Sequence, residues 1–290
     1  MRKLKMLLLL SLVCFLLMPV YTVYAREDED NPDTHSPPHQ EVVPDTVKDP
    51  RSKYTAKYLS ATGHVCTAIL ISSTAALTAQ HCGGTKARTR AGTIYPGASG
   101  TSTPFGYMNI RFYIPHPTKD IALIKGIDRD QDKFYKYYIG KFKTTVTGYT
   151  DEALSKFVEE DIYSYGYPYK EGVFKQYRSD GTITNYSKYL PLFYTNMPAS
   201  EGQSGSGVFT KNGNFIGIIT TRTHDKEADV LPFTEEITDW VNTRKLEPLL
   251  ISHNFLNFIL IRKTRGWHIV SSLFVMLQFN YNANLIPSPI

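Results

Sequence analysis

The sequence has only a small excess of charge of one sign. The chain of 290 residues has 32 Lys and Arg against 27 Asp and Glu, which gives a formal net charge of +5. No dense stripe of Lys and Arg accompanies this mild charge, so nucleic-acid binding is not expected. No internal repeat is present either, which argues against a repeat array. The content of 42% hydrophobic residues is that of a globular chain with a sizeable core.

Cysteine is also rare, with three residues in the chain. Cys14 lies in the apolar N-terminal segment, which leaves Cys66 and Cys82. Two cysteines in an oxidising compartment can pair, and closing so short a loop would contribute about 3 kcal/mol in the chain-entropy model. The alternative is two buried free thiols. We expect no metal site and no cofactor, because the histidines form no zinc-ligand pattern with one another or with acidic residues. These histidines are His64, His116 and His224.

Hydrophobic runs of a length that suits a membrane span are lacking at the N-terminus. The apolar run from Met6 to Val20 is short for a span and follows a basic start. Val23-Tyr24-Ala25 is typical of a signal-peptidase site. We therefore expect residues 1–25 to be a signal peptide, cleaved after Ala25, and the protein to be secreted (extracellular). The alternative is an uncleaved membrane anchor.

Two flanking segments differ in composition from the middle of the chain. Residues 26–50 are acidic and rich in proline, which cannot bury a core, so we expect a flexible leader or a pro-peptide. Arg51 and Lys53 are candidate processing points. Residues 248–290 have no acid, and two apolar runs there flank a basic stretch. Three interpretations of this tail stay open: a membrane-associating segment, an extra packed element, or a stretch outside the functional protein.

The middle of the chain, residues 51–247, alternates short β-rich runs with turn signals. Many short strands with turns at this spacing predict an all-β sandwich or barrel. The expected strands are 64–71, 75–78, 108–114, 121–124, 161–165, 189–194, 207–210 and 215–220. Turns are expected at 83–84, 96–97, 180–181 and 212–213. A helix is expected over 233–245, where acids precede basic residues as the helix dipole favours.

Three short motifs in this region carry residues of catalytic types. Gln80-His81-Cys82 places a histidine after an apolar strand, and Lys119-Asp120-Ile121 places an aspartate before one. The third motif is a glycine-rich turn around a serine, Glu201-Gly202-Gln203-Ser204-Gly205-Ser206-Gly207. Each motif alone is a weak or moderate signal. The order His, Asp, Ser at the ends of β-like runs is a much stronger one.

These residue types together suit acyl transfer. A serine hydroxyl is a poor nucleophile until a base removes its proton, and His81 can accept and return that proton. A carboxylate such as Asp120 fixes the imidazole tautomer and stabilises the imidazolium. Glycines beside Ser204 allow a tight turn, and the N–H groups of Gly202 and Ser204 are expected to face the developing oxyanion. The rival nucleophile is Ser206, which would leave the Gly-x-Ser-Gly turn unexplained.

The motifs around His81, Asp120 and Ser204 resemble those of the trypsin/chymotrypsin-like serine protease superfamily. The Gly-x-Ser-Gly-Ser form, together with residues 94–97 and 165–168, is similar to the glutamyl endopeptidase (V8-like) branch. The resemblance implies an all-β, chymotrypsin-like fold of two six-stranded antiparallel β-barrels, with the site between them; the predicted helix would follow them. It also implies a disulfide between Cys66 and Cys82.

The substrate pocket departs from the selective residues of that family. Glutamate-specific members place a His on the strand after the catalytic Ser, where this chain has Ile219, and a Thr five residues before that Ser, where it has Ala199. Trypsin-type enzymes place an Asp six residues before it, where this chain has Pro198. We therefore expect an apolar or neutral P1 pocket. Its expected lining is Ala199, Ile219, Thr220, Thr221 and Arg222. Arg222 and His224 either attract an acidic side chain or form a solvated loop.

The sequence therefore predicts a secreted serine endopeptidase that acts on proteins or peptides as a monomer. The alternative is a catalytically inactive, protease-like binding or toxin-like module, with membrane contact through its tail. The acidic leader suggests a zymogen, although a passive linker explains that segment as well.

Overall fold

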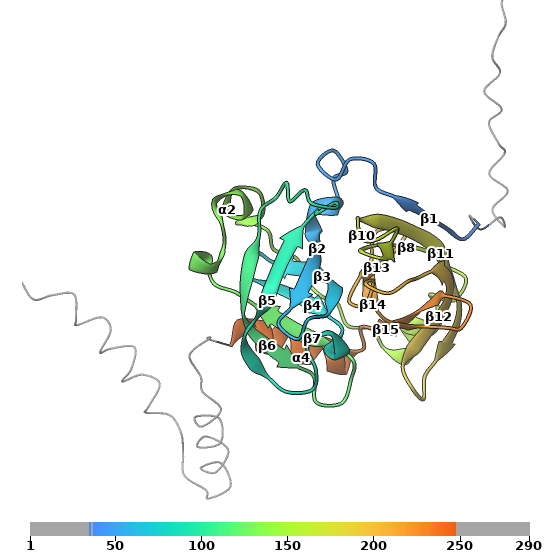
Figure 1. The fold of residues 1–290 in the computed structure, drawn as a ribbon. Helices are drawn as coiled ribbons and strands as arrows, with labels where there is room; N and C mark the ends of the chain where they lie inside the picture. Colours follow the sequence, from blue (N-terminus) through green and yellow to red (C-terminus); the bar gives the residue numbers. More distant parts are fainter. Residues whose placement is uncertain (1–34, 36, 248–290) are drawn as a thin grey trace, which may run out of the picture. The chain divides into compact units, whose positions relative to one another are not determined.

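The computed structural model describes residue 35 and residues 37–247, and those from Pro38 onward form one compact unit (Figure 1). The predicted signal peptide, residues 1–25, and the predicted tail, residues 248–290, lie outside the described residues. Within the described part of the chain, no helix is long and apolar enough to cross a membrane. The segment boundaries expected from the sequence stay predictions.

The first barrel is a closed antiparallel sheet in the order β2-β3-β4-β7-β6-β5, with β5 pairing back onto β2. Its strands are β2 (Thr55–Ser60), β3 (Val65–Ser72), β4 (Ala75–Thr78), β5 (Arg88–Pro96), β6 (Met108–Pro115) and β7 (Ala122–Lys125). Branched and aromatic residues favour such strands. Leu70, Ile94 and Ile110 are buried in its interior.

The second barrel closes because β8 pairs with both β11 and β13. Its strands are β8 (Asp161–Gly166), β11 (Tyr177–Ser187), β12 (Leu192–Pro198), β13 (Gly207–Thr210), β14 (Phe215–Arg222) and β15 (Glu227–Pro232). A small hairpin, β9 (Tyr169–Lys170) and β10 (Val173–Phe174), extends from it. Ile183, Phe193 and Ile216 are buried in its core. The predicted fold of two six-stranded barrels is confirmed.

Helix α4 (Glu235–Leu246) follows the second barrel but is fastened to the first. Thr234 caps its start, because the Thr234 hydroxyl accepts from the Ile237 N–H at 3.3 Å. At its other end Lys125, on β7, donates from Nζ to three backbone carbonyl oxygens, each at 3.0 Å. Carbonyls at a helix C-terminus otherwise lack partners. The predicted C-terminal helix is confirmed.

Short helical segments occupy the connections. They are α2 (Lys133–Ile139) and α3 (Asp151–Ser155), with the 3-10 turns η1 (Ser52–Tyr54), η2 (Gln80–Cys82) and η3 (Asp128–Asp130). Of these, η2 is the one that positions the site described below.

Residues 38–50 differ from the flexible segment that their composition predicts. β1 (His39–Val42) pairs antiparallel with β11 and extends the second sheet to seven strands (Figure 1). The Val43 side chain is buried, and the Tyr165 hydroxyl donates to the Asp49 carboxylate at 2.8 Å. Composition indicates whether a segment can form a core of its own. This segment does not need one, because its backbone pairs with a strand of the second barrel and Val43 packs against that barrel. The expected lack of packing is therefore wrong from Pro38 onward.

The predicted turn at Asp180-Gly181 is also wrong, because both residues lie inside β11. Asp180 pairs with His39 on one side and with Tyr163 on the other. At Gly181, a Cβ would lie 2.6 Å from the Cα of Met197. Glycine in a strand can mark a close approach of another backbone as well as a turn, and this one marks a close approach.

Candidate active site

His81 lies just beyond the strand that the sequence predicts will deliver it. β4 ends at Thr78, and the chain turns into η2, where the imidazole is 47% exposed. The next residue, Cys82, forms a disulfide with Cys66 on β3. The pairing that the resemblance implies is confirmed, and it ties the turn that carries His81 to the wall of the first barrel.

Asp120 lies in the loop between β6 and β7. Hydrogen bonds stabilise this loop and connect it to η2. The His116 Nδ1 accepts from the N–H groups of Thr118 and Lys119, at 3.2 and 3.1 Å. The Gln80 side chain, on η2, donates to the His116 carbonyl oxygen. Burial of the His116 ring lowers its pKa, which favours the unprotonated imidazole that these contacts need. The carboxylate is thus held at a fixed place relative to η2.

The three predicted residues meet in one hydrogen-bonded line. The Nδ1 of His81 lies 2.8 Å from Asp120 Oδ2, and its Nε2 lies 2.9 Å from Ser204 Oγ. The backbone N–H of His81 also donates to Asp120 Oδ1 at 2.9 Å, which orients the carboxylate. A proton on Nδ1 leaves Nε2 free to accept the serine proton. The rival, Ser206, has 0% exposure and so cannot reach a substrate in this structure.

The turn before Ser204 presents two backbone N–H groups. Those of Gly202 and Ser204 donate to no other described residue. The Glu201 carbonyl oxygen accepts from the Tyr169 N–H at 2.8 Å, so the opposite end of the same trans peptide, the Gly202 N–H, points the other way. Both groups are therefore available to an oxyanion beside Ser204.

Thr67, on β3 of the first barrel, holds this turn. Its N–H donates to the Ser204 carbonyl at 2.9 Å, and its hydroxyl donates to the Gly202 carbonyl at 2.7 Å. The following residue, Gly205, has a φ of 89°, and a Cβ there would lie 2.2 Å from the Thr67 carbonyl oxygen. A left-handed and crowded position of this kind requires glycine. The motif glycine lets the serine turn lie directly on the first barrel.

A cavity of about 310 Å³ opens beside the triad and is bounded by β14. The residues predicted to form the substrate pocket all line it, namely Ala199, Ile219, Thr220, Thr221 and Arg222. Ala199 and Ile219 are buried, whereas Arg222 is exposed. His224, which the sequence also singled out, is absent from the lining residues described for this cavity. Apart from the triad, the wall is apolar and hydroxyl-bearing, with one exposed cation, Arg222, and one exposed anion, Glu201.

A second cavity, of about 460 Å³, reaches His81 and Ser204 from the side of the disulfide. Its wall includes pocket residues that the sequence analysis missed, namely Val65, Tyr169, Phe174 and Glu201. The rings of Tyr169 and Phe174 lie 5.0 Å apart on the hairpin β9–β10. Strands of two residues are too short to show a period in the sequence. The proximity of Glu201 to the serine motif was the one available signal.

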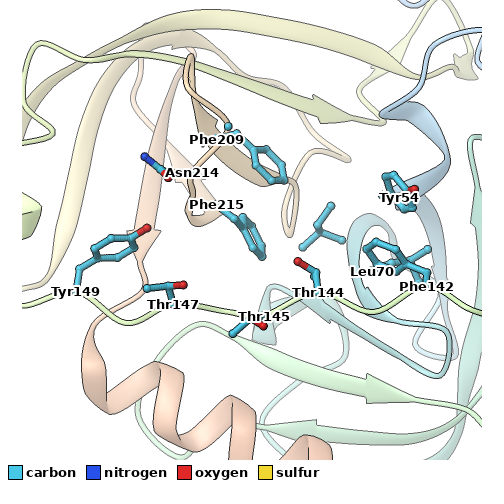
Figure 2. Close-up of a pocket in the computed structure, with 12 residues that line it drawn as sticks. Tyr54, Leu70, Phe142, Thr144, Thr145, Thr147, Tyr149, Phe209, Asn214 and Phe215 are labelled. Atoms are coloured by element: carbon cyan, nitrogen blue, oxygen red, sulfur yellow. The ribbon is translucent and has the colours of Figure 1, made fainter.

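A third cavity, of about 360 Å³, is lined by other residues than the triad (Figure 2). Phe209 and Phe215 stack there with ring centroids 4.9 Å apart, and Tyr54 and Phe142 stack at 4.3 Å. Threonines of the segment that connects the barrels form one wall. Its side chains offer apolar packing and hydroxyls, without an acid-base pair.

The site contains one cluster of residues whose types can bind a metal. It consists of Cys66, His81 and Cys82, whose candidate ligand atoms lie within 4.8 Å of one another. The two sulfurs are bonded to each other, so neither is a thiolate ligand. The group therefore offers a single imidazole, which is too few for a protein zinc site.

Three solved structures with the same fold are described as proteases. A Glu endopeptidase in complex with MPD aligns with a TM-score of 0.59 and 21% identity, over 72% of this chain and 97% of that one. A thermostable serine protease from an extremophilic microorganism has a TM-score of 0.52 and 16% identity, over 66% and 98%. Neuropsin of mouse brain has a TM-score of 0.50 and 15% identity, over 67% and 95%. At these identities the likeness shows the fold.

A family model extends this likeness to the sequence. The model of the trypsin-like peptidase domain matches residues 66–218, a range that contains all three residues of the hydrogen-bonded line. A search of curated proteins found no significant match. The resemblance inferred from the motifs is confirmed. Because the family model covers more than half of the 290 residues, the chain belongs to the trypsin-like peptidase family and is a serine endopeptidase.

Proposed function

We propose that the protein hydrolyses peptide bonds in two steps, through an acyl-enzyme on Ser204. His81 Nε2 takes the hydroxyl proton as Ser204 Oγ attacks the scissile carbonyl carbon. The N–H groups of Gly202 and Ser204 stabilise the oxyanion that forms. His81 then gives its proton to the leaving amine, while Asp120 stabilises the imidazolium. Water attacks the acyl group by the same route and releases the acid.

One observation carries this proposal. The contacts of 2.8 and 2.9 Å run without a break from Asp120 through His81 to Ser204, and they end beside two N–H groups that have no partner among the described residues. A catalytically inactive binding module would have no need of this combination of base, orienting acid and oxyanion donors.

The two cavities at Ser204 suggest how a peptide binds. The cavity of about 310 Å³ receives the P1 side chain, and its buried Ile219 and Ala199 favour an apolar or neutral one. The cavity of about 460 Å³ receives the residues after the cut. The disulfide supports an oxidising, extracellular location, in agreement with the predicted signal peptide.

Hydrolysis of an unfolded protein tests the proposal, with two matched variants. Ser204→Ala removes the proposed nucleophile and should lower kcat by about 10⁶-fold. Ser206→Ala removes a buried hydroxyl that has no hydrogen-bond partner among the described residues, so it should leave kcat near that of the wild type. Full activity in Ser204→Ala would contradict the proposal by assigning the nucleophile to another residue. A folded wild type without activity on any peptide would also contradict it and would favour the binding module.

A further inference from the structure

Gln203, the residue before the proposed nucleophile, is fully buried, and its side chain closes the serine turn. Its Oε1 accepts from the Ser200 N–H at 2.8 Å, while its backbone N–H donates to the Ser200 carbonyl at 3.1 Å. Its Nε2 lies 3.3 Å from the Ser179 Oγ on β11. A buried amide keeps its orientation only when its donor and acceptor groups have partners.

Gln40, on β1, supplies the contact that joins both ends of this turn. Its Nε2 donates to the Gln203 Oε1 at 3.0 Å and to the Pro198 carbonyl at 3.1 Å. The Ser179 Oγ lies 2.7 Å from the same nitrogen, so the two N–H bonds of this amide are shared among three acceptors. Pro198 precedes the turn and Gln203 ends it, so one amide group bridges the base of the turn. Gln40 lies 163 residues before Gln203 in the chain.

We propose that Gln40 is a positioning residue of the oxyanion turn, and that residues 38–50 are a working part of the active protein rather than a removable leader. The inference rests on the proposed function of Gly202 and Ser204. Gln40 is not among the residues that line the two cavities at Ser204. It acts through Gln203 by fixing the peptide groups whose N–H bonds face the oxyanion.

The rest of the segment supports a permanent place in the fold. β1 pairs with β11 over four residues, Val43 is buried, and the Arg51 guanidinium lies 4.6 Å from the centre of the Tyr163 ring. A cut after Arg51 or Lys53 would sever β1 from β2 and leave Gln40 held by noncovalent contacts alone. Processing before His39, in contrast, would keep Gln40 covalently joined to the barrels.

The catalytic effect should appear in kcat rather than KM. An oxyanion exists in the transition state and not in the bound peptide, so misaligned donors raise the barrier without weakening substrate binding. Loss of one complete donor costs about 10²–10³-fold in kcat. Loosening the turn at its base misaligns both donors in part, so we expect a loss of about tenfold.

Gln40→Met tests the bridge directly. Methionine has a similar length and keeps the backbone pairing of β1, but it cannot donate to Gln203 or Pro198. The control is Glu41→Gln, a change at the neighbouring, exposed position of the same strand. We expect kcat to fall about tenfold in Gln40→Met with KM nearly unchanged, and both constants to stay near wild type in the control.

Hydrogen exchange of peptides that cover residues 199–206 gives a second readout, independent of catalysis. In folded Gln40→Met these amides should exchange faster than in wild type, while peptides from β6 exchange as before. An unchanged kcat in Gln40→Met overturns the proposal, with or without faster exchange, and so does an equal loss in Glu41→Gln. If the wild type hydrolyses nothing, the proposed function fails instead, and exchange alone decides whether Gln40 holds the turn.

Discussion

At the scale of single residues, one threonine fixes the position of the oxyanion turn relative to the first barrel. Thr67 is fully buried, and its hydroxyl both donates to the Gly202 carbonyl and accepts from the Tyr167 N–H at 3.0 Å. Since Thr67 belongs to the first barrel and these partners to the second, the hydroxyl sets the oxyanion turn against the strand beside His81. Removing it would leave the buried N–H of Tyr167 and the half-buried carbonyl of Gly202 unpaired.

We predict that Thr67→Val lowers kcat about tenfold or more with little change in KM, because the Gly202 peptide loses its anchor. The free energy of unfolding should fall by about 1–3 kcal/mol, the cost of unpaired buried groups. Steady-state kinetics and urea unfolding measure the two effects. Thr89→Val, at an exposed position of β5, is the matched control. A kcat equal to that of the control would show that the hydroxyl has no part in positioning the turn.

The pocket residues predict a preference for uncharged P1 side chains. Ile219 and Ala199 bury apolar surface in the wall, and Pro198 stands where a basic P1 would need an acid. A peptide library varied at P1 should therefore be cut faster after apolar or neutral residues than after Glu or Arg. A strong preference for Glu that disappears in Arg222→Gln would overturn this and assign the selectivity to the exposed cation.

The sequence predicts the catalytic side chains better than the residues that hold them. His81, Asp120 and Ser204 each stand in a short local motif at the end of a strand. Thr67 contacts a residue 135 positions away, and no local pattern marks it. A structural role for Gln40 was not predicted either, because the composition of residues 26–50 indicates a flexible segment.

At the scale of elements, the loop from β6 to β7 depends on the protonation of one histidine. The Nδ1 of His116 accepts two backbone N–H bonds, and its ring packs 4.8 Å from that of Trp240 on α4. Burial lowers the pKa of His116 from its ordinary 6.5; Glu236 on α4 acts in the opposite direction, and Lys119 adds to the lowering. A protonated Nδ1 could not accept these bonds.

The stability of the protein should therefore fall as the pH drops below about 6.5. With a lowered pKa in the folded state, the unfolded chain binds the proton first, so acid favours unfolding in the window below the ordinary pKa. His116→Asn keeps an acceptor near the same place and does not titrate. The free energy of unfolding, measured by urea at pH 5, 6, 7 and 8, should decrease less toward acid in this variant. Parallel pH profiles for variant and wild type would exclude the histidine as the cause.

At the scale of the whole molecule, the site exists where the two barrels meet. His81 and Asp120 come from the first barrel and Ser204 from the second. Thr67 joins the barrels at the site, and Lys125 joins β7 to the end of α4. The short β-rich runs predict a sandwich or barrel, and the resemblance of the motifs to the protease superfamily implies two barrels. The strands β2, β5, β11 and β15 were not predicted, although each pairs with a strand next to it in the sequence. Their sequences mix polar and charged residues with apolar ones, so they do not stand out as apolar runs.

The place of β1 on the second barrel predicts where the active protein begins. If residues 38–50 belong to the working fold, N-terminal sequencing of secreted, active material should give a terminus before His39. The reason is that Gln40 and Val43 both contact the second barrel. A terminus at Ser52 or Tyr54, after cleavage at Arg51 or Lys53, would show that the segment is a removable pro-peptide.

The central claim is that His81 activates Ser204 as a nucleophile. Labelling with a fluorophosphonate, followed by mass spectrometry of the peptide that contains both serines, tests it most directly. We predict one adduct on Ser204 of the folded wild type, and labelling that is much slower in His81→Ala. An adduct on Ser206, an equal rate in His81→Ala, or no adduct on the folded wild type would contradict the claim.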